Sequence, residues 1–119
     1  MYKRQLLGIV EQHVANGCKR IKLKVSPRDG YERTRLVRDA YPELALAVDA
    51  NQSYTYDQLD MVAAYNDLNL LCIEEPFSMT NLTTYKAWKE SLPNWPITTS
   101  ICLDAVSYTH LTLPTICSV

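Results

Sequence analysis

Charged side chains close the successive apolar segments of this sequence, and their types suit metal-assisted acid–base chemistry. They are Lys22 and Lys24 in the first segment, and then Asp49, Glu74 and Asp104 at the ends of the next three. Three carboxylates gathered in one place repel one another unless a cation neutralises them, and Mg²⁺ takes oxygen ligands while keeping positions for water or substrate. A lysine beside such a cation can act as a base. The set therefore predicts a Mg²⁺ site with a basic side chain next to it.

The spacing of these residues matches repeated strand–helix units. Lys24, Asp49, Glu74 and Asp104 follow one another at intervals of about 25 to 30 residues, close to the roughly 30 residues per unit of an eight-fold barrel. Active sites of parallel α/β folds lie at the carboxyl ends of the strands, where the chain leaves the sheet. We therefore expect these side chains to point toward one shared rim.

Four short segments have the pattern of strands in a parallel sheet. Residues 19–25 alternate polar and apolar, so that the two lysines share one face. Residues 44–49 and 70–73 are nearly continuous apolar runs, as is typical of strands buried on both faces. Residues 97–103 form the last such segment, and Asp104 directly follows it.

Helical patterns occupy the segments between these strands. We expect helices at the start of the chain before Gly17, over residues 31–40, after a capping box at residues 55–58, and over residues 81–91. Alternating strands and helices predict right-handed βαβ units and a parallel sheet. The predicted fold class is α/β, a partial (β/α)8 TIM-type barrel that runs from about the first helix through the fifth strand.

The composition favours a small-molecule partner. The chain has 119 residues, a formal net charge of −1 and 47% hydrophobic residues. This charge offers no basic surface for nucleic acid. No apolar run approaches the roughly 20 residues that span a bilayer, and the start has no apolar signal segment. We expect a cytoplasmic protein with no membrane partner, and the sequence indicates no oligomeric state.

The four cysteines form no paired motif and no metal-type spacing with the two histidines; they are Cys18, Cys72, Cys102 and Cys117. We expect reduced, buried thiols. Such thiols behave as small hydrophobic side chains.

The end of the chain differs from what precedes it. Residues 106–115 have neither a strand nor a helix pattern, and their reverse translation reproduces the transposase adapter used in shotgun sequencing libraries. We therefore interpret residues 105–119 as a non-native translated adapter tail and residues 1–104 as a partial barrel domain. On this interpretation His110 and Cys117 have no function.

Four short phrases of the sequence resemble one known family. They are Lys-Leu-Lys at 22–24, Val-Asp-Ala-Asn at 48–51, Ile-Glu-Glu-Pro at 73–76 and Cys-Leu-Asp at 102–104. Together they look like the barrel of the enolase superfamily, in its muconate-lactonizing subgroup, and the resemblance covers residues 3–104. Within the subgroup the sequence is most similar to the o-succinylbenzoate synthases and the related N-acylamino acid racemases.

The resemblance implies a ligand set for Mg²⁺. Asp49, Glu74 and Asp104 stand at the positions of the family's metal ligands. Glu75 stands where the family often has glutamine, so it is not counted as a ligand.

The resemblance also implies roles for three further side chains. Lys24 would be the general base that removes a proton from the substrate. Lys22 would assist in catalysis and hold the substrate carboxylate, and Asn51 would line the substrate site. The substrate would then be a small carboxylate.

The implied reaction begins with removal of the proton α to a carboxylate, which gives a dianionic enediolate stabilised by Mg²⁺. An o-succinylbenzoate synthase then expels hydroxide, a dehydration in menaquinone biosynthesis. An N-acylamino acid racemase or a dipeptide epimerase instead reprotonates the intermediate on its other face. This chain is itself expected to be inactive, because the family's capping domain, first strand and later strands have no counterpart in it.

A receiver-like, non-enzymatic α/β signalling domain is the alternative from another class. Its size fits, and it also places an aspartate after its third strand. It needs acidic residues after its first strand and a lysine after its last. Here the order is reversed, with Lys22 and Lys24 first and Asp104 last.

Overall fold

The computed structural model describes residues 2–78, 81–103 and 116–119. Asp104, which the sequence predicts as a metal ligand, lies outside the described residues, and so does His110.

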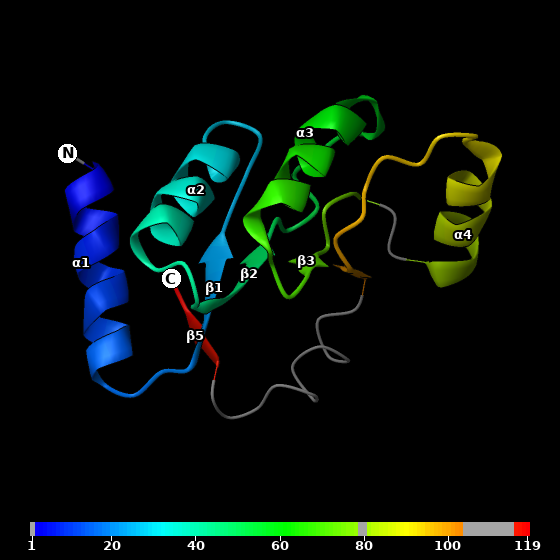
Figure 1. The fold of residues 1–119 in the computed structure, drawn as a ribbon. Helices are drawn as coiled ribbons and strands as arrows, with labels where there is room; N and C mark the ends of the chain where they lie inside the picture. Colours follow the sequence, from blue (N-terminus) through cyan, green and yellow to red (C-terminus); the bar gives the residue numbers. More distant parts are fainter. Residues whose placement is uncertain (1, 79–80, 104–115) are drawn as a thin grey trace.

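One sheet of five parallel strands, in the order β4-β3-β2-β1-β5, forms the centre of the fold (Figure 1). The strands are β1 (Arg20–Lys24), β2 (Ala45–Asp49), β3 (Ile73–Glu74), β4 (Ile101–Cys102) and β5 (Ile116–Ser118). Every pairing between neighbours is parallel. The predicted α/β class is therefore confirmed.

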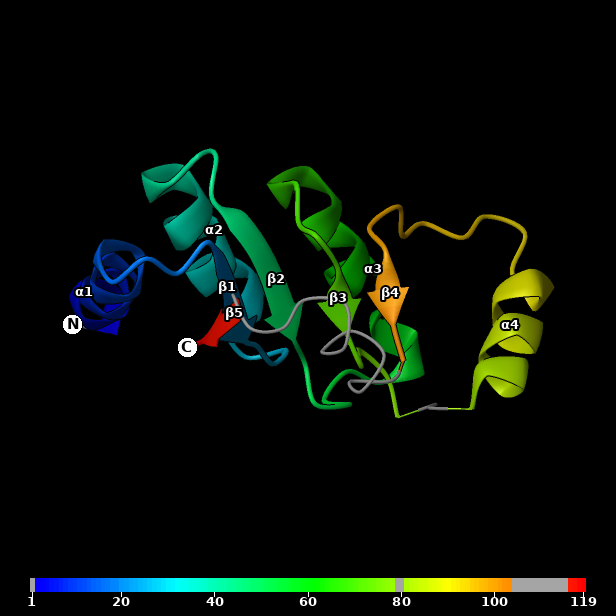
Figure 2. The same cartoon turned by 90° about the horizontal axis from the view of Figure 1, so that it is seen from below.

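One helix precedes β1, and helices connect the first four strands. They are α1 (Tyr2–Ala15), α2 (Gly30–Ala40), the short α3 (Leu59–Ala63) between the 3-10 turns η1 (Tyr56–Gln58) and η2 (Ala64–Leu68), and α4 (Leu82–Ser91). Figure 2 shows α2 and α3 behind the sheet and α1 beside its β1–β5 edge. Within the described part of the chain, none of the helices has the length and apolar character that crossing a membrane requires.

Local signals place most of these elements where the sequence predicts them. Gly17 follows α1 with a φ of 95°, a conformation that glycine adopts without strain. The predicted capping box is present, since the Thr55 and Gln58 side chains each bond the other residue's backbone. The structure differs in the lengths of some elements and in the additional strand β5. The helix after this box is divided into 3-10 and α segments, and β3 and β4 have two residues each.

The cysteine prediction is wrong for two of the four residues. Cys18 and Cys117 form a disulfide across 99 residues of sequence, while Cys72 and Cys102 are not in a disulfide; Cys72 is buried and Cys102 is partly buried. The pairing of β5 with β1 brings the end of the chain next to the segment that follows α1, a contact that no local pattern predicts. The interpretation of residues 105–119 as a non-native tail stays a prediction.

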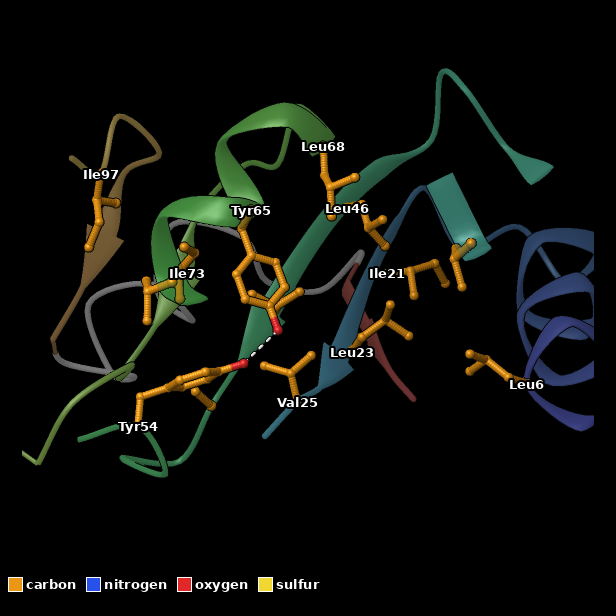
Figure 3. Packing of buried hydrophobic residues seen from close by; sticks show 14 of the residues in the cluster. Leu6, Ile21, Leu23, Val25, Leu46, Tyr54, Tyr65, Leu68, Ile73 and Ile97 are labelled. Atoms are coloured by element: carbon orange, nitrogen blue, oxygen red, sulfur yellow. Dashed lines mark hydrogen bonds between the residues drawn. The ribbon is translucent and has the colours of Figure 1, made fainter. Parts of the chain in front are cut away.

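The hydrophobic core lies between the sheet and its covering helices (Figure 3). Ile21 and Leu23 of β1 are fully buried and point toward the helices, which leaves the two lysines of the same strand on the other face. Tyr65 reaches the core from η2, and its hydroxyl lies 2.7 Å from the hydroxyl of Tyr54. The alternation of β1 therefore separates the core from the polar rim.

Gly30, the first residue of α2, packs tightly against this tyrosine pair. A Cβ atom at this position would meet the Tyr65 hydroxyl and would lie 2.7 Å from Cβ of Val25. We expect Gly30→Ala to lower the free energy of unfolding by about 2 kcal/mol, because the buried neighbours cannot move aside. Urea unfolding followed by tryptophan fluorescence measures the change.

Gly8→Ala is the matched control for this substitution. Gly8 lies within α1, and a Cβ atom there would have no neighbour within 4 Å. Alanine should therefore raise stability by up to about 1 kcal/mol through its better helix propensity. Equal effects of the two substitutions would contradict the packing argument.

Candidate metal centre

The carboxyl ends of three neighbouring strands bring charged side chains to one level of the sheet. Lys24 is the register partner of Asp49, and Asp49 is the register partner of Glu74. Each of the three is the last residue of its strand. The predicted shared rim therefore exists for these residues, whereas the position of Asp104 is not described.

Two lysine–carboxylate pairs cross this rim. Lys24 Nζ donates a hydrogen bond to Asp49 Oδ2 at 3.1 Å, and Lys22 Nζ lies 3.4 Å from Glu74 Oε2. The carboxylates are buried, with 5% of Asp49 and 1% of Glu74 exposed. The side chain of Lys24 is 53% exposed and that of Lys22 only 14%. Lys24 is thus open to an approaching molecule, while Lys22 is held among the acidic groups.

Glu74 carries a buried oxygen without a hydrogen bond. Its Oε2 atom has no hydrogen-bond partner among the described residues, and Lys22 Nζ, 3.4 Å away, is its ionic partner. Burial raises the pKa of Glu74, the charge of Lys22 opposes this, and the nearby Asp49 carboxylate raises the pKa further. A buried carboxylate oxygen with a free lone pair is the type of donor that a hard divalent cation takes.

Asn51 supports the pair formed by Lys24 and Asp49. Its backbone N–H donates to Asp49 Oδ1 at 3.1 Å. With the side-chain amide oriented to satisfy both neighbours, its nitrogen donates to Asp49 Oδ1 and its oxygen accepts from Lys24 Nζ, each at 3.3 Å. Asn51 therefore orients a candidate ligand and the candidate base together, and the prediction that it lines a substrate site stays untested.

The sequence analysis assigned no role at the site to three supporting residues, Tyr54, Arg33 and Tyr65. The Tyr54 hydroxyl donates to the carbonyl of Ser26 at 3.1 Å, which connects the loop after β2 with the loop after β1. Arg33 of α2 donates to the carbonyl of Lys24 at 2.7 Å. The hydroxyl of Tyr65 forms a hydrogen bond with the hydroxyl of Tyr54. The only sequence signal for these residues is indirect: the carbonyls that Tyr54 and Arg33 contact, those of Ser26 and Lys24, lie at or just after the end of β1.

A second group of metal-type ligands lies at the other end of β1. His13, Cys18 and Cys117 lie close enough together to share an ion, but the two cysteines form the disulfide described above. Both thiols are therefore already bonded. This group is separate from the rim that carries Asp49 and Glu74.

Comparison with known proteins places the chain in context. Residues 5–110 match the family described as "Enolase C-terminal domain-like". An N-succinylamino acid racemase of Thermus thermophilus is 37% identical over 82% of this chain and 25% of its own length. An o-succinylbenzoate synthase of Geobacillus stearothermophilus is 35% identical over 83% of this chain and 25% of its own length. The chain thus spans about a quarter of these relatives.

Solved structures agree with this match. A protein from Enterococcus faecalis, described as an unknown member of the enolase superfamily, superimposes with a TM-score of 0.75 at 33% identity, covering 86% of this chain and 26% of that one. A second superfamily member, from Listeria innocua, superimposes with a TM-score of 0.74 at 30% identity, covering 92% of this chain and 30% of that one. The predicted fold class, part of a TIM-type barrel, is confirmed.

Proposed function

Because the chain belongs to the enolase superfamily, as a member of the family of enolase C-terminal domain-like sequences, we propose that it is a section of a Mg²⁺-dependent enzyme. The enzyme would remove the proton α to the carboxylate of a small molecule. The observation that carries this proposal is the alignment of Lys24, Asp49 and Glu74 at the ends of three adjacent strands.

The donor set supports a hard divalent cation. Asp49 and Glu74 offer carboxylate oxygens, and the buried Oε2 atom of Glu74 has no hydrogen bond. We propose that these two residues and Asp104 would hold Mg²⁺. When bound, the ion would supply positive charge that stabilises the negative charge developing on the substrate.

The lysines would have different tasks. Lys24 is the more exposed of the two, and its Nζ atom would take the α proton of the substrate. Asn51 would keep that amine beside Asp49. Lys22 contacts Glu74 in the described structure, and we propose that it turns to the substrate carboxylate once a cation neutralises the acidic residues.

The preferred activity for the parent enzyme is that of an o-succinylbenzoate synthase, a carbon–oxygen lyase of menaquinone biosynthesis. Several of the matched relatives bear this name. The alternative is an N-acylamino acid racemase or dipeptide epimerase, and the Thermus relative at 37% identity is named an N-succinylamino acid racemase. Both reactions start with the same proton removal, so Lys24, Asp49 and Glu74 would have the same roles in either reaction.

The chain of 119 residues is proposed to be catalytically inactive by itself. It covers about a quarter of its relatives, and an enzyme of this type needs further groups that exclude water and donate or accept the second proton. Proton removal by Lys24 alone would not complete either reaction.

Recovery of the uninterrupted gene from the source DNA tests the proposal. We expect the codon after Asp104 to encode glutamate and a later strand to supply a second lysine. The complete enzyme should then dehydrate the succinylbenzoate precursor, or racemise an N-succinylamino acid, only with Mg²⁺ present. If the source DNA instead encodes residues 105–119 and then stops, the interpretation of the tail and the proposed enzyme both fail.

A further inference from the structure

Strained backbone is concentrated at the ends of β2 and β3. Four described residues other than glycine have positive φ: Asn51 at 49°, Gln52 at 61°, Glu75 at 45° and Asn69 at 51°. Asn69 caps the end of η2, where this conformation is common. Of the other three, Glu75 directly follows Glu74, while Asn51 and Gln52 are the second and third residues after Asp49, and no helix end accounts for the strain at these positions.

A positive φ is least expected at Glu75. A residue with a Cβ atom pays about 1 kcal/mol or more for the left-handed conformation. The following residue is Pro76, whose ring disfavours helical backbone at the preceding position. Surrounding contacts must therefore hold Glu75 in this conformation.

Hydrogen bonds between the two turns supply those contacts. The Gln52 N–H donates to the Glu75 carbonyl at 2.7 Å, and the Glu75 N–H donates to the Cys102 carbonyl of β4 at 2.7 Å. The Gln52 side-chain amide also donates to Glu75 Oε2 at 3.3 Å. The next link joins the Tyr54 N–H to the Pro76 carbonyl at 3.0 Å.

The two linked turns connect directly to the candidate ligands. Gln52 is three residues after Asp49, Glu75 directly follows Glu74, and the two candidate ligands are register partners. A change in the Gln52–Glu75 link would rotate the peptides that follow each ligand. The separation and direction of the two carboxylates depend on those peptides.

We propose that Gln52 and Glu75 are positioning residues, which join the turns after β2 and β3 so that Asp49 and Glu74 face one cation. This inference rests on the proposed function. Glu75 acts here as a hydrogen-bond acceptor for Gln52 and not as a ligand. Its negative charge is not needed for that task, so an amide at this position serves equally well.

Titration of the 119-residue chain with Mn²⁺, used as a paramagnetic probe for the Mg²⁺ site, tests the proposal. Gln52→Ala and Glu75→Ala should each weaken Mn²⁺ binding by about tenfold, the range found when groups that orient metal ligands are removed. The double variant Gln52→Ala/Glu75→Ala should bind Mn²⁺ no more weakly than either single variant. Glu75→Gln should bind within about twofold of the unmodified chain, since it keeps the acceptor.

Two exposed residues outside the site supply matched controls. Gln12 lies on α1, and Glu43 precedes β2 at the opposite end of the sheet. Gln12→Ala and Glu43→Ala should leave the Mn²⁺ affinity unchanged. The urea midpoint of the metal-free chain should be the same in all variants, whereas a purely structural role would lower the midpoint in Gln52→Ala and Glu75→Ala.

The possible outcomes separate this inference from the proposed function. If the unmodified chain binds Mn²⁺ and both alanine variants bind it equally well, the positioning role is wrong and the metal site stands. If Glu75→Gln is as weak as Glu75→Ala, the charge of Glu75 matters and the acceptor role is wrong. If the unmodified chain shows no saturable Mn²⁺ binding, the metal site and the positioning role are both overturned.

Discussion

Glu74→Gln is expected to lower the Mn²⁺ affinity of this chain by about 100-fold or more. Groups that only orient metal ligands are worth 10- to 100-fold, so a ligand itself should be worth at least the upper limit of that range. Glutamine keeps the shape of the side chain and removes the anionic oxygen that has no hydrogen bond. Titration with Mn²⁺, followed by the electron paramagnetic resonance signal of the free ion, measures the affinity.

The same substitution should leave the metal-free chain folded. Glu74 is 1% exposed, and burying an ionised carboxylate is costly unless it is paired and fully hydrogen-bonded. Replacing it with a neutral amide removes that cost, although Lys22 loses its ionic partner. The variant should therefore keep a cooperative urea transition while its affinity for the cation falls.

Asp49→Asn provides an independent second variant. Asp49 accepts from Lys24 Nζ at Oδ2 and from the backbone of Asn51 at Oδ1, so we expect a loss of Mn²⁺ affinity with little loss of structure. Glu43→Gln, an exposed acidic residue at the other end of the sheet, should have no effect. Unchanged affinity in both site variants would refute the proposed ligand set.

Arg38→Ala is expected to lower the free energy of unfolding by about 3 kcal/mol, the largest effect that we expect on stability. The guanidinium of Arg38, near the end of α2, donates to backbone carbonyls that precede β2 and β3. These are the carbonyls of Tyr41, Pro42, Leu44, Leu68 and Asn69, at 2.7 to 3.1 Å. One charge-assisted hydrogen bond contributes about 1.5–3 kcal/mol, and several that share one guanidinium are not additive.

The Arg38 prediction has two controls. Arg35→Ala removes an arginine of the same helix whose ion pair with Asp39 is 3.8 Å long and largely exposed, so it should change stability by less than about 0.5 kcal/mol. Arg38→Lys should recover little of the stability lost in Arg38→Ala, because an ammonium group cannot reach carbonyls on two separate loops. Urea unfolding followed by tryptophan fluorescence measures all three; equal losses for Arg35→Ala and Arg38→Ala would contradict the proposed role.

The position of the candidate site at one end of the sheet could be predicted from the sequence. Apolar runs that stop at Asp49 and Glu74 specify strand ends, and the alternation around Lys22 and Lys24 specifies their shared face. Both signals are local, since a strand's alternation and a helix's capping depend on neighbours a few residues away. The capping box at residues 55–58 was predicted correctly for the same reason.

The connections between the units could not be predicted in this way. Asn66 of η2 donates to the carbonyl of Pro96 at 2.8 Å and accepts from the backbone of Thr98 at 2.9 Å, and nothing in its sequence neighbourhood indicates either bond. The Cys18–Cys117 disulfide is a similar case. Such pairs depend on which loops the packed helices bring together.

By itself, the sequence determined the α/β class, the order of the elements from α1 to β4 and the residues that close β1, β2 and β3, because these follow from short-range patterns of polarity. Only the tertiary structure decided how the charges combine. It paired Lys24 with Asp49 and Lys22 with Glu74, left one Glu74 oxygen without a hydrogen bond, and held Glu75 in a left-handed turn. The physical reason is that burial, pairing and strain arise from contacts between separate strands, which exist only once the sheet has formed.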